Sequence, residues 1–267
     1  MTPFSQGSNP QVGPVGQLYI AYESAVCESL ACNNAGDHDA IIVATSFDGG
    51  RTFINTEVTA DFDFPFNDDV EDSTLTGENF RLNSFPMMTI DPVTGKLYIV
   101  WADDRNGDYN SSGESVRTNG DVFIVGSFDG FHWSQPKPIG SHEDEFFPAV
   151  AAFGGQVAVT FYTRHYDPKG IGLDVAAVTA FDALGLNVLS HVPLRRITTE
   201  TENPQVQFVG IGALSGIVLQ GTFIGDYAAV AMGSDGLFHP CWTDFRGKPG
   251  VTAPNQDIYT QAIRFAD

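Results

Sequence analysis

Four stretches of the sequence repeat the same order of short apolar segments and turns, and this repeat constrains the fold more than any other feature. The clearest copy covers residues 84–140, where turns rich in Gly, Pro and Asp separate the segments FPMMTID, KLYIVWA, GDVFIVGS and SQPKPI. Runs of this length with alternating or continuous apolar character are typical of β-strands. Each copy is therefore predicted to form one four-stranded antiparallel sheet.

Three further copies extend the pattern over nearly the whole chain. They cover about residues 9–60, 146–197 and 223–267, and the last copy ends without a fourth strand. In the third copy we interpret NVLSHVPL as the outer strand. Residues 198–222 lie outside the repeat and are predicted to form an extra strand pair or an extended loop. Units repeated in this way are typical of β-propeller blades, so the sequence predicts a single all-β propeller domain over residues 1–267.

The incomplete last unit leaves the predicted ring with open sheet edges, which propellers normally avoid by closing. We expect Thr2 to Gln6 to supply the missing outer strand. Three alternatives stay open: the chain is a fragment, it is an unusually small propeller, or association between chains completes the ring.

The charge and hydropathy of the chain exclude two classes of partner. The 33 acidic and 13 basic residues give a formal charge of -20, which repels phosphate backbones, so no nucleic acid is expected as a partner. No run of about 18 apolar residues occurs, so no membrane span is predicted. Residues 1–14 lack the basic start and apolar stretch of a signal peptide, and if the protein is exported its leader has been removed.

Acidic and amide side chains are densest in one segment, at Asp61, Asp63, Asn67, Asp68, Asp69, Glu71 and Asp72. Carboxylate oxygens are ligands that calcium prefers, so a calcium site at Asp68, Asp69 and Asp72 is one interpretation. The other is that the charge serves solubility. The segment lacks the spaced, glycine-centred loop of an EF-hand, and no cofactor is expected to be required.

Two of the three cysteines lie close together. Cys27 and Cys32 stand in a polar segment, where a disulfide and two free thiols are about equally expected. Cys241 lies in an apolar run and is predicted to be a buried thiol.

A short turn motif occurs between the third and fourth strands of two units. Its residues are Ser46, Asp48, Gly50, Thr52 and Phe53 in the first unit, and Ser127, Asp129, Gly130 and Trp133 in the second. Asp and Ser side chains can bond nearby backbone amides, glycine supplies a positive φ, and the aromatic residue pins the hairpin. The motif resembles the Asp box, or BNR repeat, of the sialidase-like β-propellers. The segment FIGDYAAVAMGSDGLFHPCWTDFRG is similar to the final blade of bacterial extracellular members, which usually have six blades.

Strand alternation predicts where a ligand would bind. The turns after the first and third strands of each blade lie on one face, which the Asp boxes mark. The long polar loops after the second and fourth strands therefore surround the mouth of the central channel on the opposite face.

An arginine follows the second strand in three of the four units. These residues are Arg105, Arg164 and Arg246, whereas the first unit has Glu23. Guanidinium groups suit a substrate carboxylate, and the resemblance implies a triad that, with Tyr162, would bind substrate. The alternative is that each arginine pairs with a neighbouring aspartate and fixes its own loop.

The start of the fourth unit carries candidate catalytic groups. The resemblance to sialidases implies a tyrosine nucleophile and an aspartate that transfers a proton. Tyr227 would take the first role, and the second would fall to Asp103, Asp226 or Asp244. The alternative is structural, with Asp226 bonding backbone amides and Tyr227 filling the channel.

The family's F-R-I-P motif, which supplies the first arginine of its triad, has only a partial counterpart. The nearest string is Phe80-Arg81-Leu82-Asn83, which lacks the proline. The sequence therefore favours a secreted or cell-surface propeller that binds a carbohydrate or glycoconjugate, as a glycan-binding module or a degenerate glycosidase. One alternative is an active, retaining exo-glycosidase of the sialidase-like class. The other is a structural or protein-interaction module of a larger assembly.

Overall fold

The computed structural model describes residues 4–68, 70, 72–182, 186–204, 210–211, 218–219, 223–246 and 256–265. Apart from the short 3-10 helix η2 (Leu186–His191), the regular elements of these residues are β-strands. None of the helices in this part of the chain has the length and apolar character needed to cross a membrane.

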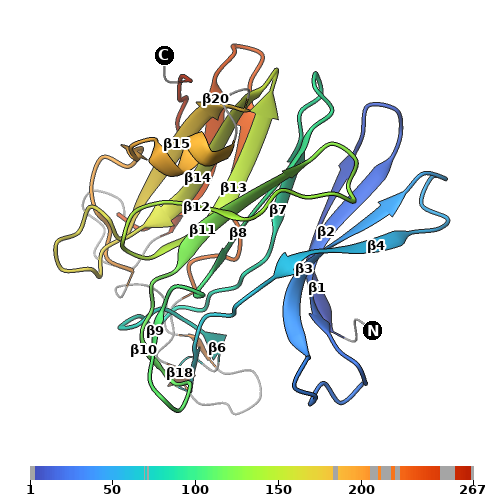
Figure 1. Cartoon of the computed structure of the whole chain (residues 1–267). Coiled ribbons are helices and arrows are strands. Elements are labelled where there is room, and N and C mark those ends of the chain that lie inside the picture. The colour runs from blue at the N-terminus through green and yellow to red at the C-terminus, as the bar shows by residue number, and fades with distance from the viewer. Residues whose placement is uncertain are drawn as a thin grey trace.

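Three four-stranded antiparallel sheets and one three-stranded sheet follow one another along the chain (Figure 1). The first contains β1 (Ser5–Val12), β2 (Leu18–Val26), β3 (His38–Ser46) and β4 (Ile54–Ala60). The second contains β7 (Met87–Ile90), β8 (Leu97–Asp103), β11 (Asp121–Ser127) and β12 (Lys137–Ile139). The third contains β13 (Glu145–Phe153), β14 (Gln156–Thr163), β15 (Asp174–Phe181) and β16 (Arg195–Arg196), and the fourth β19 (Ala229–Met232), β20 (Phe238–Asp244) and β21 (Asp257–Thr260).

Three two-stranded pairs lie outside these sheets. They are β5 (Phe66–Asn67) with β6 (Asp72–Ser73), β9 (Asp108–Tyr109) with β10 (Ser115–Arg117), and β17 (Gly210–Ile211) with β18 (Val218–Leu219). The last pair falls within the segment that the sequence placed outside the repeat.

The sheets pack face to face as propeller blades do. Along β8, Ile99 and Trp101 join an apolar cluster shared with β2 and β3 of the first sheet. The alternate residues Tyr98 and Val100 join a second cluster that also holds side chains of the third and fourth sheets. Because successive side chains of a strand point to opposite faces, the second sheet is buried on both sides.

The first strands of consecutive sheets also contact one another, β1 against β7, β7 against β13 and β13 against β19. The molecule is therefore an all-β propeller built of antiparallel blades. In Figure 1 the first blade lies on the right, the second in the centre, and the third and fourth on the left.

Two predictions about strands are wrong. Ser5 and Gln6 pair with Ser24 and Glu23, so this segment begins the innermost strand of the first blade and does not complete the fourth. NVLSHVPL does not form a strand, because residues 186–191 are the 3-10 helix η2 and the edge pairing is made by Arg195 and Arg196. The apolar side chains that suggested a strand include Leu189, which packs into the larger core cluster from the helix.

The two predicted Asp-box turns have the expected hydrogen bonds. Asp48 Oδ1 accepts from the backbone amides of Arg51 and Thr52, both at 2.9 Å. Ser46 Oγ donates to Asp48 Oδ1 and accepts from the amide of Gly50, whose φ is +83°.

The second turn repeats this network around its own aspartate. Asp129 Oδ1 accepts from the amides of Phe131 and His132 at 2.9 and 2.8 Å. Its aromatic residue Trp133 packs against the smaller core cluster, whereas Phe53 of the first turn is 42% exposed. The expected pinning by an aromatic ring thus applies to the second turn more than to the first.

We expect Ser46→Ala to lower the free energy of unfolding by about 1 kcal/mol. The buried hydroxyl of Ser46 is the acceptor for the Gly50 amide, which would lose its partner. A urea titration should show a lower midpoint with an unchanged slope. Ser8→Ala, at an exposed position of β1, is the matched control, and equal midpoints for the two variants would contradict the prediction.

Cys27 and Cys32 form a disulfide in the loop after β2. Cys241 is a free thiol, and it is half-buried on β20, where the sequence predicted a fully buried one.

Candidate functional site

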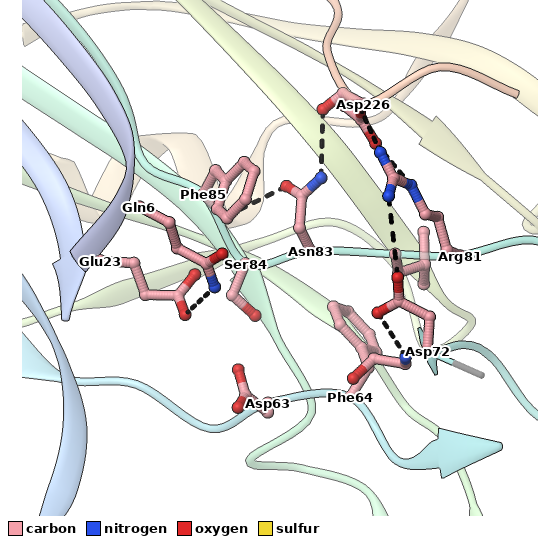
Figure 2. A pocket seen from close by; sticks show the side chains of 12 residues that line it. Gln6, Glu23, Asp63, Phe64, Asp72, Arg81, Asn83, Ser84, Phe85 and Asp226 are labelled. Carbon is pink, nitrogen blue, oxygen red and sulfur yellow. Dashed lines mark hydrogen bonds and ion pairs between the residues drawn. The ribbon is translucent and has the colours of Figure 1, made fainter. Parts of the chain in front are cut away.

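A cavity of about 170 Å³ opens on the face where the innermost strands begin (Figure 2). Its wall combines the start of β1, the end of β2, the segment after β4, the segment before β7 and the residues before β19. The lining residues are Gln6, Glu23, Asp63, Phe64, Asp72, Ser73, Arg81, Leu82, Asn83, Ser84, Phe85 and Asp226. The Asp-box turns follow third strands and lie on the opposite face.

One wall of the cavity is an ion pair between residues far apart in the sequence. Arg81 donates to both carboxylate oxygens of Asp226, from Nε at 3.0 Å and from Nη2 at 2.7 Å. Asn83 Nδ2 donates to the backbone carbonyl of Asp226 at 3.3 Å. A bidentate guanidinium–carboxylate pair fixes the orientation of both groups, so the entry to β7 holds the entry to β19 in place.

The opposite wall is acidic, as Figure 2 shows for Glu23 and Asp63. Burial, together with the nearby Asp63 carboxylate, raises the pKa of Glu23 to about 7. Partial desolvation in the cavity wall, together with the carboxylates of Asp39 and Asp103, raises the pKa of Asp63 to about 6, although its side chain is still open to solvent. Gln6 Nε2 donates to Glu23 Oε1 at 3.3 Å. This wall therefore carries negative charge that local donors only partly compensate.

Aromatic rings stand at the rim beside the ion pair. Tyr227 is 59% exposed, and its ring stacks on Phe85 with centroids 6.0 Å apart. A Cβ on Gly7, at φ +64°, would lie 2.5 Å from Cγ of Phe85, so only glycine lets β1 approach this ring so closely. The rim thus presents an exposed aromatic face next to polar groups.

Two of the three predicted binding arginines are held by their own loops. The second and fourth blades share one arrangement around a buried aspartate. The tryptophan two residues before this aspartate and the arginine two residues after it both donate hydrogen bonds to its carboxylate. Asp103 accepts from Trp101 Nε1 and Arg105 Nε, each at 2.9 Å. Asp244 accepts from Trp242 Nε1 at 3.3 Å and from Arg246 Nε at 2.7 Å.

These two aspartates, which were predicted as candidate acids or bases, have 0% and 1% of their surface exposed. A ligand in the cavity described above would contact neither of them.

The third arginine lies in the interior. Arg164 is 5% exposed and donates to Asp144 at 2.7 Å and to Glu78 at 2.8 Å. Its neighbour Tyr162, predicted to bind substrate, is buried and donates its hydroxyl hydrogen to the carbonyl of Thr243 at 2.6 Å.

The three guanidinium groups therefore serve three different sets of carboxylates. Arg105 and Arg246 follow the alternative that the sequence left open, pairing with a neighbouring aspartate, whereas the partners of Arg164 lie 20 and 86 residues away in the sequence. The structure brings Asp226 into the cavity with Tyr227 beside it, and does not place Arg105, Arg164 or Arg246 in its lining.

The calcium site at Asp68, Asp69 and Asp72 stays a prediction, because only two of its three residues are described. Asp68 is exposed, and Asp72 lies 3.9 Å from Arg81 Nη1. Asp69 lies outside the described residues.

Sequence reasoning missed most of the cavity lining. Arg81 and Asn83 lie in the string that was compared with the family's arginine motif, which is the signal that could have identified them. Asp63 lies in the densest acidic segment, and Glu23 stands where other blades have arginine. Gln6 meets Glu23 through the pairing of β1 with β2 in the first blade, and it meets Arg81 and Asn83 only when the first and second blades pack.

The arrangement can bind a polar ligand by several kinds of contact at once. Carboxylates accept hydrogen bonds, the guanidinium donates, and the amides of Gln6 and Asn83 do both. Both oxygens of Asp226 are engaged by Arg81, so this carboxylate is placed to hold the wall together.

No model of a known protein family matches the sequence, and no curated protein is significantly similar to it. Among solved structures, it is similar to the NanB sialidase from Streptococcus pneumoniae, with a TM-score of 0.50, 9% sequence identity, and coverage of 92% of this chain and 49% of that one. It is also similar to the phage phi92 endosialidase, with a TM-score of 0.52, 10% identity, and coverage of 94% and 34%. The chain thus spans about half the length of the first structure and about a third of the second. At these identities the likeness concerns the fold and assigns no role to any residue.

Proposed function

Because this chain has the fold of the sialidase-like propellers, we propose that it binds a carbohydrate in the cavity lined by Glu23, Asp63, Arg81 and Asp226. The observation that carries the proposal is that the cavity has polar walls and an exposed aromatic ring, Tyr227, at its rim. The cavity opens on the side of the propeller where the innermost strands begin. The cavity lies between the start of β1 and the segments that lead into β7 and β19, which are the innermost strands of three blades.

The chemistry of the lining suits a sugar. Each sugar hydroxyl both donates and accepts hydrogen bonds, so its site needs acceptors and donors in alternation. Glu23 and Asp63 supply acceptors, while the Asn83 amide supplies a donor. An aromatic ring can cover the apolar C–H face of a sugar ring, and Tyr227 is placed to do so.

We propose binding as the function, in preference to hydrolysis. A glycosidase needs two groups that can exchange a proton or attack the anomeric carbon across one pocket. Asp103 and Asp244 are buried and fully engaged, and both oxygens of Asp226 accept from Arg81. Glu23 and Asp63 also line the cavity, but they lie on one wall with oxygens within 4.8 Å of each other and do not face one another across it. These contacts support a site that recognises a sugar without cleaving it.

The place of action that we propose is outside the cell. A disulfide persists in oxidising compartments, and the Cys27–Cys32 bond is of this kind. The strong net negative charge keeps a protein soluble there, and it disfavours binding to anionic surfaces.

Screening the purified chain on an array of glycans, followed by calorimetry with the best ligand, tests this proposal. We expect Tyr227→Ala and Asn83→Ala each to weaken binding about tenfold, which corresponds to about 1.4 kcal/mol. Phe47→Ala is the matched control, because Phe47 is 61% exposed in the Asp-box turn on the opposite face. Equal losses for Phe47→Ala and Tyr227→Ala would contradict the assignment of the site.

Fluorogenic sialosides and other glycosides extend the same test to turnover. We expect no release of the fluorophore above the background rate. Release by the wild type that Tyr227→Phe abolishes would show that the chain is an active glycosidase of the sialidase type.

A further inference from the structure

Three carboxylates from two separate segments converge at the acidic wall of the cavity. Glu23 lies near the end of β2, Asp61 directly follows β4, and Asp63 comes two residues later. One oxygen of each lies within 4.8 Å of one oxygen of each of the other two. Glu23 and Asp61 are 6% and 5% exposed, whereas Asp63 is open to solvent.

The Asp61 carboxylate is buried without a hydrogen-bond donor. Both of its oxygens are enclosed, and no amide, hydroxyl or cationic group among the described residues donates to them. The side chain within hydrogen-bonding reach is the carboxyl of Asp103, which is itself an acceptor when ionised. Buried carboxylates normally accept several hydrogen bonds, since an ionised group without partners is very unfavourable in a protein interior. An ionised Asp61 would therefore be stabilised by a bound cation.

The surroundings add further negative charge. The carboxylates of Asp103, Glu23 and Asp63 all raise the pKa of Asp61, although burial raises it most. The guanidinium of Arg105 is engaged by Asp103 and by the carbonyl of Ala60. Within the described part of the chain, no cation therefore pairs with the three converging carboxylates.

We propose that Glu23, Asp61 and Asp63 bind a calcium ion at the wall of the cavity. Carboxylate oxygens are hard ligands that suit calcium, and calcium tolerates irregular geometry with six to eight oxygens. Three carboxylates leave coordination positions open, and Glu23 and Asp63 line the cavity, so these positions face it. The inference stands apart from carbohydrate binding, because the ion needs no sugar to be held.

A rival explanation is that protons hold the cluster together. Two carboxylates can share one proton when burial and like charges raise their pKa values. The two explanations differ in their response to calcium at neutral pH, where a proton-filled cluster would be indifferent to the ion.

Titration of the chelator-treated full chain with calcium chloride, followed by calorimetry and by thermal unfolding, tests the proposal. We expect about one ion per chain and a rise in Tm with calcium, because a ligand that binds only the folded state stabilises it. Asp61→Asn should weaken calcium binding at least tenfold and abolish the rise in Tm. Its metal-free Tm should exceed that of the metal-free wild type, because the substitution removes one of the repelling charges.

Two further variants separate this site from its neighbourhood. Asp68→Asn, in the same acidic segment but exposed, should bind calcium like the wild type. Glu23→Gln should weaken binding as Asp61→Asn does, and it serves if Asp61→Asn fails to fold. Absence of binding at millimolar calcium, or an equal loss in Asp68→Asn, would overturn the proposal. An equal response to magnesium chloride would overturn the assignment to calcium.

Discussion

Replacing Arg164 with Met is expected to lower the free energy of unfolding by about 3–5 kcal/mol. The guanidinium group bridges Asp144 and Glu78, and the side chains of all three residues are at most 5% exposed. Nη2 also donates to the carbonyl of Thr76 at 3.1 Å. Met keeps most of the apolar stem, so the loss reports on the charge: two carboxylates would stay buried without a cation.

A chemical denaturation series between about pH 7 and about pH 9 measures this effect, because the loss depends on whether Glu78 is ionised in the variant. Burial already raises the pKa of Glu78 to about 7 even though Arg164 lowers it. Without Arg164 the pKa of Glu78 should rise further, so the defect should shrink as the pH falls and Glu78 takes up a proton.

Arg117→Met is the matched control for this prediction. Arg117 pairs with Glu143 at 3.2 Å, but their side chains are 60% and 41% exposed. Exposed pairs contribute about 0–1 kcal/mol, so this variant should be nearly as stable as the wild type. Similar losses of unfolding free energy for the two variants would show that the buried Arg164 bridge contributes no more stability than an exposed ion pair.

The stability of the protein is expected to fall as the pH rises from about 5 to about 8, and Glu145 is the residue we expect to contribute most clearly. This side chain has 0% of its surface exposed, and burial raises its pKa to about 8, although hydrogen bonds from Ser141 and Thr163 lower it. The hydrogen bonds from Ser141 and Thr163 all end on Oε1, while Oε2 is buried and has no partner among the residues that the structure describes.

The sign follows from the direction of the shift. The folded state holds the proton more tightly than the unfolded chain, so the stabilisation is complete below the unfolded pKa and is lost as the pH rises through the folded pKa. With the folded pKa near 8 and an ordinary value of 4.5, the loss extends over that interval. One such group changes the unfolding free energy by at most about 1.4 kcal/mol per pH unit.

Glu145→Gln isolates this contribution, since an amide resembles the protonated acid and does not titrate. The variant should lose less stability than the wild type between about pH 5 and about pH 8, with a difference on the order of 3 kcal/mol. Glu143→Gln, two residues away and exposed, should keep the wild-type profile. Parallel profiles for the wild type and Glu145→Gln would show that Glu145 is ionised in the folded protein at neutral pH.

The sequence pattern alone predicted the strands of those sheets that are packed against apolar side chains on both faces. β8 and β11 have seven buried residues each, and their continuous apolar runs could belong only to strands sandwiched between blades. The pattern predicted the wrong element at the outer edge of the third blade. An element at the edge of a sheet buries few apolar side chains, so its sequence constrains its conformation only weakly. There the 3-10 helix η2 buries Leu189 as well as a strand would.

The candidate site was much less predictable than the fold. Repeat position suggested that Arg105, Arg164 and Arg246 were equivalent and would act together. Arg105 and Arg246 are equivalent, since each donates to the aspartate two residues before it. A residue can recur at the same position of several blades because it stabilises each blade as well as because it binds a ligand. The sequence pattern alone could not distinguish these roles.

The sequence by itself determined the blades, the Asp-box turns and the face on which the loops lie, because each depends on neighbours a few residues apart. Only the tertiary structure decided the site, because its groups come from segments that local pattern does not relate. Arg81 meets Asp226 across 145 residues, and Glu23 on β2 meets Asp61 after β4 across the intervening strand β3. Ion pairs and cation sites depend on distances between side chains, and the packing of the blades sets these distances. They could therefore not be predicted from residues that are neighbours in the sequence.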